Sequence, residues 1–493
     1  MMRSPFLTVA LSASTVASLI PVRASHQVSQ TAWHFPWPVI DGQVLVHRNV
    51  AKAATSGAKT VGMFTPKRRS IQPLNLGGTQ RIGFSRLMMS DTSAAAVPLS
   101  NPLPSQNVLQ RPPIVVHEKG QTPFQLLAAL GTAIGGTGKA KMVWRSLRQG
   151  KDPWTNEEEL TEKARQTLLR DFEPLPSVSM GSQASCGTVK MLVRLFDGLE
   201  VEAVVIPHEG RPTANAIVEP RTTLCVSSQV GCNRGCAFCA TGKMGFVRNL
   251  SVHEILSQVF LAQQCIRQHS LPPLHNVVFM GMGEPLNNAG NVADAVRILT
   301  DDNCFQISPS KVTVSSVGPN PDLIHATKDI RAMLAWSVHA ADDALRRQLV
   351  PTTKHPMTLL RDTYKEVLLS RTRGMSVFMV AVTLINGVND AEKHARELVE
   401  LLLPLREAGI KLCVDLIPYN DIGDVAGSIK FERAQPDRVN AFQKVVRSYG
   451  LTCFVRVTRG DDEAAACGQL VTTAGKLRRK RGSIAGDSQK QGA

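Results

Sequence analysis

The sequence predicts an α/β protein whose main domain is a partial (β/α)6 barrel. Strand and helix patterns alternate from Thr222 onward, which favours a parallel sheet with helices on its outer side. Polar or glycine-rich motifs follow several of these strands, at the edge where a barrel carries its active site. The 493 residues suffice for about two or three domains and a large core.

The first 120 residues do not read as a folded domain. Residues 1–23 form an acid-poor, partly apolar start with Arg3 and Arg23 at its flanks, which is typical of a targeting segment. Residues 24–120 are rich in Ser, Pro, Gly, Ala and Thr without a period, and we expect a disordered linker. The expected location is a plastid; the alternatives are a mitochondrion, or the cytoplasm if the segment is no signal.

The net charge of +16 favours an anionic partner such as nucleic acid. Residues 1–125 hold 12 Lys and Arg against 3 Asp and Glu and so carry +9 of that charge, which weakens the inference for the rest of the chain. The run Pro5–Val22 contains several hydroxyl residues and Pro21 and is a poor membrane span, so we expect no stable membrane association.

Two small units precede the barrel. Residues 121–180 predict a helical module with helices over Phe124–Ile134, Lys139–Arg148 and from a capping box at Thr155–Glu158 through Leu169. Residues 181–221 predict a β-hairpin and a connector. Its two strands, on either side of the turn Asp197-Gly198, are Val189–Phe196 and Leu199–Ile206.

The barrel is expected over residues 222–472. Its predicted strands are 222–229, 275–281, 311–315, 332–338, 376–385 and 411–417. The helical patterns between and after them include Val252–Gln268, Val292–Thr300, Leu359–Ser370, Ala391–Arg406 and Pro436–Tyr449. A last strand, Cys453–Val457, leads into the loop Thr458–Leu470, and residues 473–493 form a basic tail.

Three cysteines follow the first barrel strand with the spacing CxxxCxxC: Cys232, Cys236 and Cys239. Three thiolates can hold an iron–sulfur cube and leave one iron open, whereas structural zinc takes four ligands. Cys225, on the strand itself, is the only nearby fourth ligand, so zinc remains an alternative. The ten cysteines form no regular pairs, which indicates a reducing compartment instead of a disulfide framework.

Polar residues also end the later strands. Gly283 and Glu284 follow the second strand, Ser315 ends the third, and Asn420 follows the sixth. The fourth strand ends in Ser337-Val338-His339. Each alone is more often a turn or cap residue, but several at corresponding strand ends favour a ligand site. Cys467 lies between small residues in a late polar loop, where it is either a small buried side chain or a reactive thiol.

These motifs together resemble the radical S-adenosylmethionine RNA methyltransferases of the RlmN/Cfr family. The resemblance covers about residues 121–472 and rests on four segments: TLCVSSQVGC at 223–232, GFVRNL at 245–250, GMGEPLNN at 281–288 and TRGDDEAAACGQL at 458–470. It fits the RlmN branch, which methylates carbon 2 of an adenine, better than the carbon-8 branch.

The resemblance implies a role for each motif. Cys232, Cys236 and Cys239 would bind a [4Fe-4S] cluster. Cys467 would carry the methyl group, Cys225 would resolve the adduct, and Glu202 would accept a proton. Two molecules of S-adenosylmethionine would be used per turnover, and the cofactor would be bound by Gly283, Glu284, Ser315, Ser337, Val338, His339 and Asn420.

The role of Glu202 is the least secure of these. The chain has extra residues around His208–Glu219 relative to the family pattern, and Glu200 is a rival on the same strand. The simpler interpretation is that Glu200 and Glu202 both lie on the solvent-exposed face of the hairpin.

The expected function is methylation of carbon 2 of an adenine in large-subunit (23S-type) rRNA, with tRNA as a second candidate substrate. The expected partners are RNA and an electron donor such as flavodoxin or ferredoxin, and we expect a monomer. The alternatives are carbon-8 methylation, another radical enzyme of this fold, and a zinc-stabilised RNA-binding protein without catalysis.

Overall fold

The computed structural model describes residues 121–212, 217–375, 377–423 and 430–472. All of them belong to one compact unit. The expected targeting segment, linker and basic tail lie outside the described residues. Within the described part of the chain, no helix is long and apolar enough to cross a membrane.

Three helices open the described chain: α1 (Leu127–Ala133), α2 (Thr137–Arg148) and α3 (Glu162–Asp171). The buried Trp144 of α2 lies with its ring edge against Phe305, at a centroid distance of 5.2 Å, and Phe124 stacks on the same Phe305. Phe305 follows helix α6 of the barrel, so an aromatic contact joins the helical module to the barrel.

The start predicted for the third helix is wrong. The helix begins at Glu162 and not at Thr155, and Thr161 is its N-cap. The preceding segment forms turns, because the buried Asn156 side chain donates to the Ser146 hydroxyl of α2 at 2.8 Å. The Thr155–Glu158 pattern therefore belongs to a turn that packs on α2.

The predicted hairpin is confirmed: β2 (Val189–Arg194) pairs antiparallel with β3 (Glu200–His208). A further strand, β1 (Ser177–Gln183), pairs with β2 and was not predicted, because its sequence SVSMGSQ lacks a clear apolar alternation. β3 also pairs antiparallel with β6 (Arg221–Cys225), which joins the hairpin to the barrel. The connector holds a short ribbon of β4 (Arg211–Pro212) and β5 (Ile217–Val218).

The main sheet has the order β1-β2-β3-β6-β9-β10-β11-β12-β13-β14. From β6 onward every neighbouring pair is parallel, and β1 and β14 are not paired with each other, so the predicted open α/β barrel is confirmed. The strands after β6 are β9 (Leu274–Phe279), β10 (Val312–Ser316), β11 (Met333–Ser337), β12 (Val377–Leu384), β13 (Lys411–Pro418) and β14 (Thr452–Val455).

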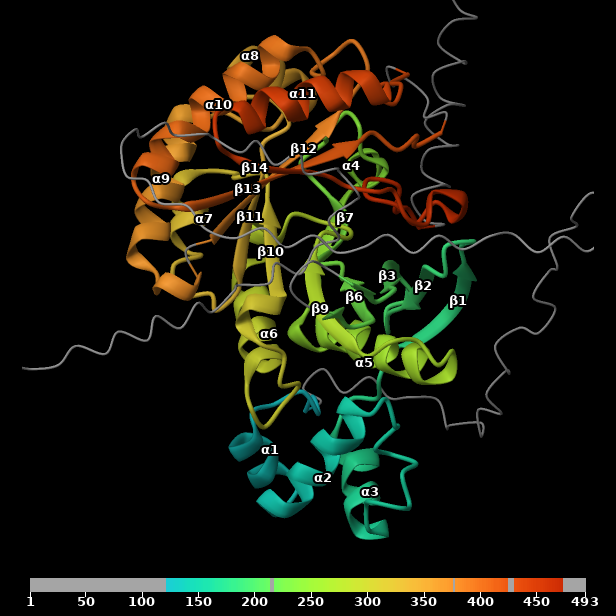
Figure 1. The fold of residues 1–493 in the computed structure, drawn as a ribbon. Helices are drawn as coiled ribbons and strands as arrows, with labels where there is room; N and C mark the ends of the chain where they lie inside the picture. The colour runs from blue at the N-terminus through green and yellow to red at the C-terminus, as the bar shows by residue number, and fades with distance from the viewer. Residues whose placement is uncertain (1–120, 213–216, 376, 424–429, 473–493) are drawn as a thin grey trace, which may run out of the picture. The chain divides into compact units, whose positions relative to one another are not determined.

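Helices cover the outer side of this sheet, as Figure 1 shows for α9, α10 and α11. Helix α5 (Val252–Gln268) has its predicted bounds, and Ser251 and Glu254 form a capping box at its start. Helices α7 and α8 were not predicted. The remaining helices are α6 (Ala289–Thr300), α7 (Pro321–His325), α8 (Asp343–Leu349), α9 (Met357–Ser370), α10 (Glu392–Glu407) and α11 (Pro436–Ser448).

The strand predicted over 222–229 is in fact two elements. β6 ends at Cys225, and β7 (Gln229–Cys232) forms an antiparallel ribbon with β8 (Gly245–Asn249). Gly231 makes this ribbon possible, since it has φ +74° and a Cβ there would lie 1.9 Å from the backbone oxygen of the facing strand. The chain between β7 and β8 contains the remaining cysteines of the CxxxCxxC motif.

Candidate active site

The cluster loop, residues Cys232–Cys239, begins at the end of β7 and ends at the N-cap of α4 (Ala240–Met244). The Ala237 amide donates to the Leu349 carbonyl at the end of α8, at 2.9 Å. Gly235 has φ +62°, which lets the loop turn back on itself. The loop is thereby held between its own ribbon and α8.

The cluster loop lies in apolar surroundings. Burial raises the pKa of Cys232 to about 12 and that of Cys236 well above the usual thiol value, and the neighbouring Cys239 raises the pKa of both further. These thiols stay protonated at neutral pH unless a metal centre stabilises their thiolates. The side chains packed with Cys236 are Phe238, Val317, Ala340, Leu349, Val350, Ile385 and Tyr419.

The donor set fits a [4Fe-4S] cluster. Three mutually interacting thiols share one loop, and the pKa of Cys225 responds to Cys467 and Arg456 instead of to this loop, so Cys225 is not placed as a fourth zinc ligand. Among the described residues no three His, Cys, Asp or Glu side chains, these cysteines included, are gathered closely enough to hold one metal ion, whereas in a [4Fe-4S] cluster each thiolate binds a different iron. Three soft sulfur donors in an apolar loop are the ligands that an iron–sulfur centre prefers.

The residues predicted to bind S-adenosylmethionine lie along the same edge of the sheet. Gly283 has φ +105°, and a Cβ there would lie 2.7 Å from the Gln229 side chain. The Ser315 and Ser337 hydroxyls, at the ends of β10 and β11, are 3.1 Å apart. The carboxyl ends of β9, β10 and β11 therefore bring these polar groups together.

Glu284 is buried and its two oxygens accept from the backbone amides of Leu286 and Val317, both at 3.0 Å. Burial raises its pKa, and the hydrogen bonds oppose that rise. The carboxyl group thus ties the turn after β9 to the end of β10.

His339 lies at φ +56° with its ring 4.5 Å from Phe238 of the cluster loop. Its Nδ1 accepts from the Thr383 amide at 3.1 Å, and burial lowers its pKa far below the usual value, so the ring is neutral. Val338 is fully buried. The Asn420 amide nitrogen donates to the Cys467 carbonyl at 3.1 Å.

The loop Thr458–Leu470, called here the Cys467 loop, is hydrogen-bonded to the start of α4. The Ala240 amide donates to the Gly468 carbonyl at 2.7 Å, and the Thr241 hydroxyl donates to the Leu470 carbonyl at 2.6 Å. Two residues far apart in sequence, Cys239 and Cys467, are therefore neighbours, and the Cys239 thiol contributes to raising the pKa of Cys467.

Cys467 lies close enough to Cys225 to contribute to raising its pKa, and the Arg456 guanidinium acts on both thiols. Cys467 is solvent-accessible, although protein surrounds it closely enough to raise its pKa; burial raises that of Cys225 to about 12. The Arg456 guanidinium opposes both shifts and is itself ion-paired with Asp415. All ten cysteines, these two included, are free thiols.

Glu202 is buried at 5% exposure on the side of β3 that faces the Cys467 loop. Its Oε2 accepts from the Val471 amide at 2.6 Å, and its Oε1 lies 3.5 Å from Lys190 Nζ. Lys190 also donates to the Ala464 carbonyl. The carboxylate thus lies against the loop that carries Cys467.

Glu200 is placed less favourably. It lies nearer the hairpin turn, and its carboxylate is 3.2 Å from Arg194 Nη2. The extra residues around His208–Glu219 form the β4–β5 connector. In the register of β3 against β6, Val204 pairs with Cys225.

Sequence reasoning missed four charged residues at this site: Lys190, Arg346, Asp415 and Arg456. Asp415 interrupts the buried pattern of β13, and Arg456 directly follows β14; the charge in β13 is a usable signal because a buried charge needs a partner. Arg346 and Lys190 lie in ordinary amphipathic patterns and give no such signal.

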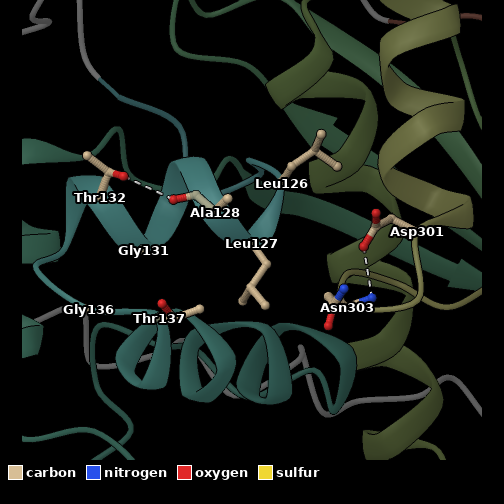
Figure 2. Close-up of a pocket in the computed structure, with 9 residues that line it drawn as sticks. All are labelled: Leu126, Leu127, Ala128, Gly131, Thr132, Gly136, Thr137, Asp301 and Asn303. Atoms are coloured by element: carbon tan, nitrogen blue, oxygen red, sulfur yellow. Dashed lines mark hydrogen bonds between the residues drawn. The ribbon is translucent and has the colours of Figure 1, made fainter.

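A separate pocket of about 530 Å³ lies between α1, the start of α2 and the chain after α6 (Figure 2). Leu127, Gly131 and Thr137 line it from the helical module, and Asp301 and Asn303 line it from the barrel. None of the predicted site residues lines this pocket.

The comparisons with known proteins agree with this geometry. The radical SAM superfamily sequence model matches residues 226–402. A probable dual-specificity RNA methyltransferase RlmN from Synechococcus sp. (strain JA-2-3B'a(2-13)) is 42% identical over 59% of this chain and 76% of its own length. The dual-specificity RNA methyltransferase RlmN of Syntrophobacter fumaroxidans is 37% identical over 68% of this chain and 92% of its own length.

A crystal structure of a radical SAM methyltransferase from Sphaerobacter thermophilus is also similar. It is 31% identical, covers 72% of this chain and all of its own, and has a TM-score of 0.63. The radical SAM match carries with it the cofactors of this chain, a [4Fe-4S] cluster and S-adenosylmethionine. The chain therefore belongs to the RlmN family of radical S-adenosylmethionine methyltransferases.

Proposed function

We propose that this enzyme methylates carbon 2 of an adenine in large-subunit rRNA and in tRNA, through a methyl group carried on Cys467. The observation that carries the proposal is the convergence of two free thiols and a carboxylate beside the cluster loop: Cys467, Cys225 and Glu202. The relatives named dual-specificity RNA methyltransferase support the choice of substrate.

The target atom explains why two thiols are needed. Carbon 2 of adenine lies between two ring nitrogens and is too electron-poor to attack a sulfonium methyl group. Cys467 can accept the methyl group instead of the adenine carbon. Its thiolate attacks the methyl carbon of S-adenosylmethionine directly, and S-adenosylhomocysteine leaves. The cluster would supply the electron that cleaves a second S-adenosylmethionine, so that the methyl group on sulfur can be activated by loss of a hydrogen atom.

The remaining residues would then release the product. Once the methylene group on Cys467 is bonded to carbon 2, Glu202 accepts the proton that this carbon loses. Once one electron has returned from the adduct to the oxidised cluster, the Cys225 thiolate attacks the Cys467 sulfur. A disulfide forms, the electron pair of the broken carbon–sulfur bond goes to the methylene carbon, and a proton completes the methyl group.

The test is mass spectrometry of nucleosides from rRNA fragments and tRNA transcripts after reaction with the anaerobically reconstituted enzyme. We expect 2-methyladenosine in both RNA classes. Finding 8-methyladenosine alone would move the enzyme to the other branch, and finding no methylated nucleoside with a fully loaded cluster would refute the proposal. Cys186→Ala is the matched control for replacing Cys467 or Cys225 by Ala, because Cys186 is an exposed thiol that does not belong to the group of Cys467, Cys225 and Glu202.

We also propose a flavodoxin or ferredoxin as electron donor, a monomeric enzyme and a plastid location. The location rests on the acid-poor sequence of residues 1–23. A fusion of residues 1–120 to a fluorescent protein tests it in plant cells, and fluorescence that stays in the cytoplasm would contradict it. Light scattering tests the monomer, and reduction of the cluster by each purified donor tests the electron source.

A further inference from the structure

Arg346 is a buried cation at the junction of the cluster loop and the strand ends. Its side chain is 1% exposed. Nη1 donates to the Ser337 carbonyl at 2.8 Å and also to the Val338 carbonyl, and Nη2 donates to the Val317 carbonyl at 2.8 Å. The guanidinium therefore ties the end of β10 to the end of β11.

No carboxylate of the described chain forms an ion pair with this guanidinium. The nearest acid that acts on it is Glu284, whose oxygens bond to backbone amides instead. The Arg346 Nε atom is buried and has no hydrogen-bond partner among the described residues. A buried, unneutralised cation is costly, so its presence calls for an anion that the protein chain alone does not provide.

The cluster loop lies directly beside Arg346. The Val317 side chain, whose carbonyl accepts from Arg346, packs in the same apolar group as Cys236, and the end of α8 bonds to Ala237. Arg346 and Cys236 also act on each other electrostatically. Burial lowers the pKa of Arg346 to about 10, so the guanidinium keeps its charge at neutral pH.

We propose that Arg346 is the internal counter-cation of the [4Fe-4S] cluster and raises its reduction potential. A cube bound by three thiolates carries a net negative charge, and one-electron reduction adds another. A fixed cation in apolar surroundings stabilises the more negative state more strongly, because low local polarity leaves the attraction unscreened. The three carbonyl bonds hold the cation in place, so that it cannot move away to solvent.

The test is an EPR-monitored redox titration of the reconstituted holoenzyme. Arg346→Gln and Arg346→Met remove the charge, and Arg346→Lys keeps it without the forked geometry. Arg347→Gln is the matched control, because Arg347 is the next residue of the same helix and is exposed. Iron and sulfide content and thermal unfolding are measured for every variant.

We expect the neutral variants to disfavour the reduced cluster at least tenfold, a shift of about 59 mV to lower potential for a one-electron couple. Arg346→Lys and Arg347→Gln should stay near the wild-type potential. An unchanged potential in fully loaded neutral variants overturns the proposal, and so does an equal shift in Arg347→Gln. Loss of the fold in both neutral variants, with the Lys variant intact, would also overturn it. None of these outcomes bears on which RNA base is methylated.

Discussion

The two sides of this active site differ in polarity. On the cofactor side, apolar side chains surround the cluster loop, and the one buried cation described there, Arg346, bonds to carbonyl groups. On the thiol side, two ion pairs, Arg456–Asp415 and Lys190–Glu202, flank a solvent-accessible Cys467. The start of α4 bonds to the loop that carries Cys467, and the Asn420 side chain also joins the two sides by donating to the Cys467 carbonyl.

The contrast matches two kinds of chemistry. Electron transfer and radical formation need a dry, fixed setting that excludes water from reactive species. Thiolate attack and proton removal need charged groups that set the ionisation of each partner, and they need an opening for a base that has left its stack. Changes on the thiol side should therefore alter product release and pH dependence and leave the redox behaviour intact.

The largest effect is expected from the two thiols. Cys467→Ala should abolish both methylated RNA and any covalent protein–RNA adduct, because no carrier remains. Cys225→Ala should accumulate the adduct, because nothing attacks its sulfur. Denaturing gel electrophoresis with labelled RNA distinguishes the two, and the EPR signal of the cluster should persist in both. Release of free methylated RNA by both single variants would show that the two thiols do not work as a pair.

The carboxylate should come next. Glu202→Gln should lower the rate of methylation by about a hundredfold to ten-thousandfold, the usual contribution of a general base, and should leave methylation of Cys467 itself unchanged. Glu200→Gln is the matched control on the same strand, because its carboxylate pairs with Arg194. Single-turnover kinetics measure both. The assignment fails if Glu200→Gln is the slower variant.

The Arg456 guanidinium should have a smaller effect, on pH dependence. The Cys467 pKa is raised by burial, so the rate of Cys467 alkylation by iodoacetamide should rise with pH through the neutral range. Arg456 lowers that pKa, so Arg456→Met should move the profile to higher pH. Alkylation at neutral pH should then slow about tenfold for each pH unit that the profile moves. Identical profiles for Arg456→Met and the control Arg459→Met would contradict this electrostatic role.

The smallest effect is expected at the N-cap of α5, which belongs to neither side. Ser251→Ala removes the N-cap of α5, whose hydroxyl accepts from the Glu254 amide at 3.2 Å, and should lower the free energy of unfolding by about 1 kcal/mol. Chemical denaturation measures this loss. The potential of the cluster and the yield of methylated RNA per folded molecule should not change, and a change in either would show that the two sides depend on the helix framework.

The sequence was sufficient where a local pattern decides the structure. Helix α5 has its predicted bounds, since a capping box and a long apolar period mark it. The segment 222–229 was misjudged as one strand because it begins with strand-favouring residues and contains no Gly or Pro. After Cys225 the Ser227 amide donates to the Gln258 side chain and the Ser227 hydroxyl donates to the Glu202 carbonyl, contacts between distant residues that no local period encodes.

The candidate site shows the same division. The three cluster cysteines lie close together in the sequence and could be recognised directly. Arg456, in contrast, pairs with Asp415, which is 41 positions away, and Lys190 contacts Glu202 of β3 and the Ala464 carbonyl of the Cys467 loop. Such pairs form only when the folded chain brings these distant segments together. The residue roles carried over from the family resemblance remain predictions.

The pairing of β3 with β6 fixes the spacing between Glu202 and Cys225. Because Val204 lies beside Cys225, Glu202 stands two residues further along its strand, about 7 Å away along the chain direction. The connection between the two strands runs from His208 to Arg221, which are paired with each other at the end of the ladder away from Glu202 and Cys225. The chain should therefore accept an added or deleted residue in that connection, or an engineered tag, without a change in the spacing between Glu202 and Cys225.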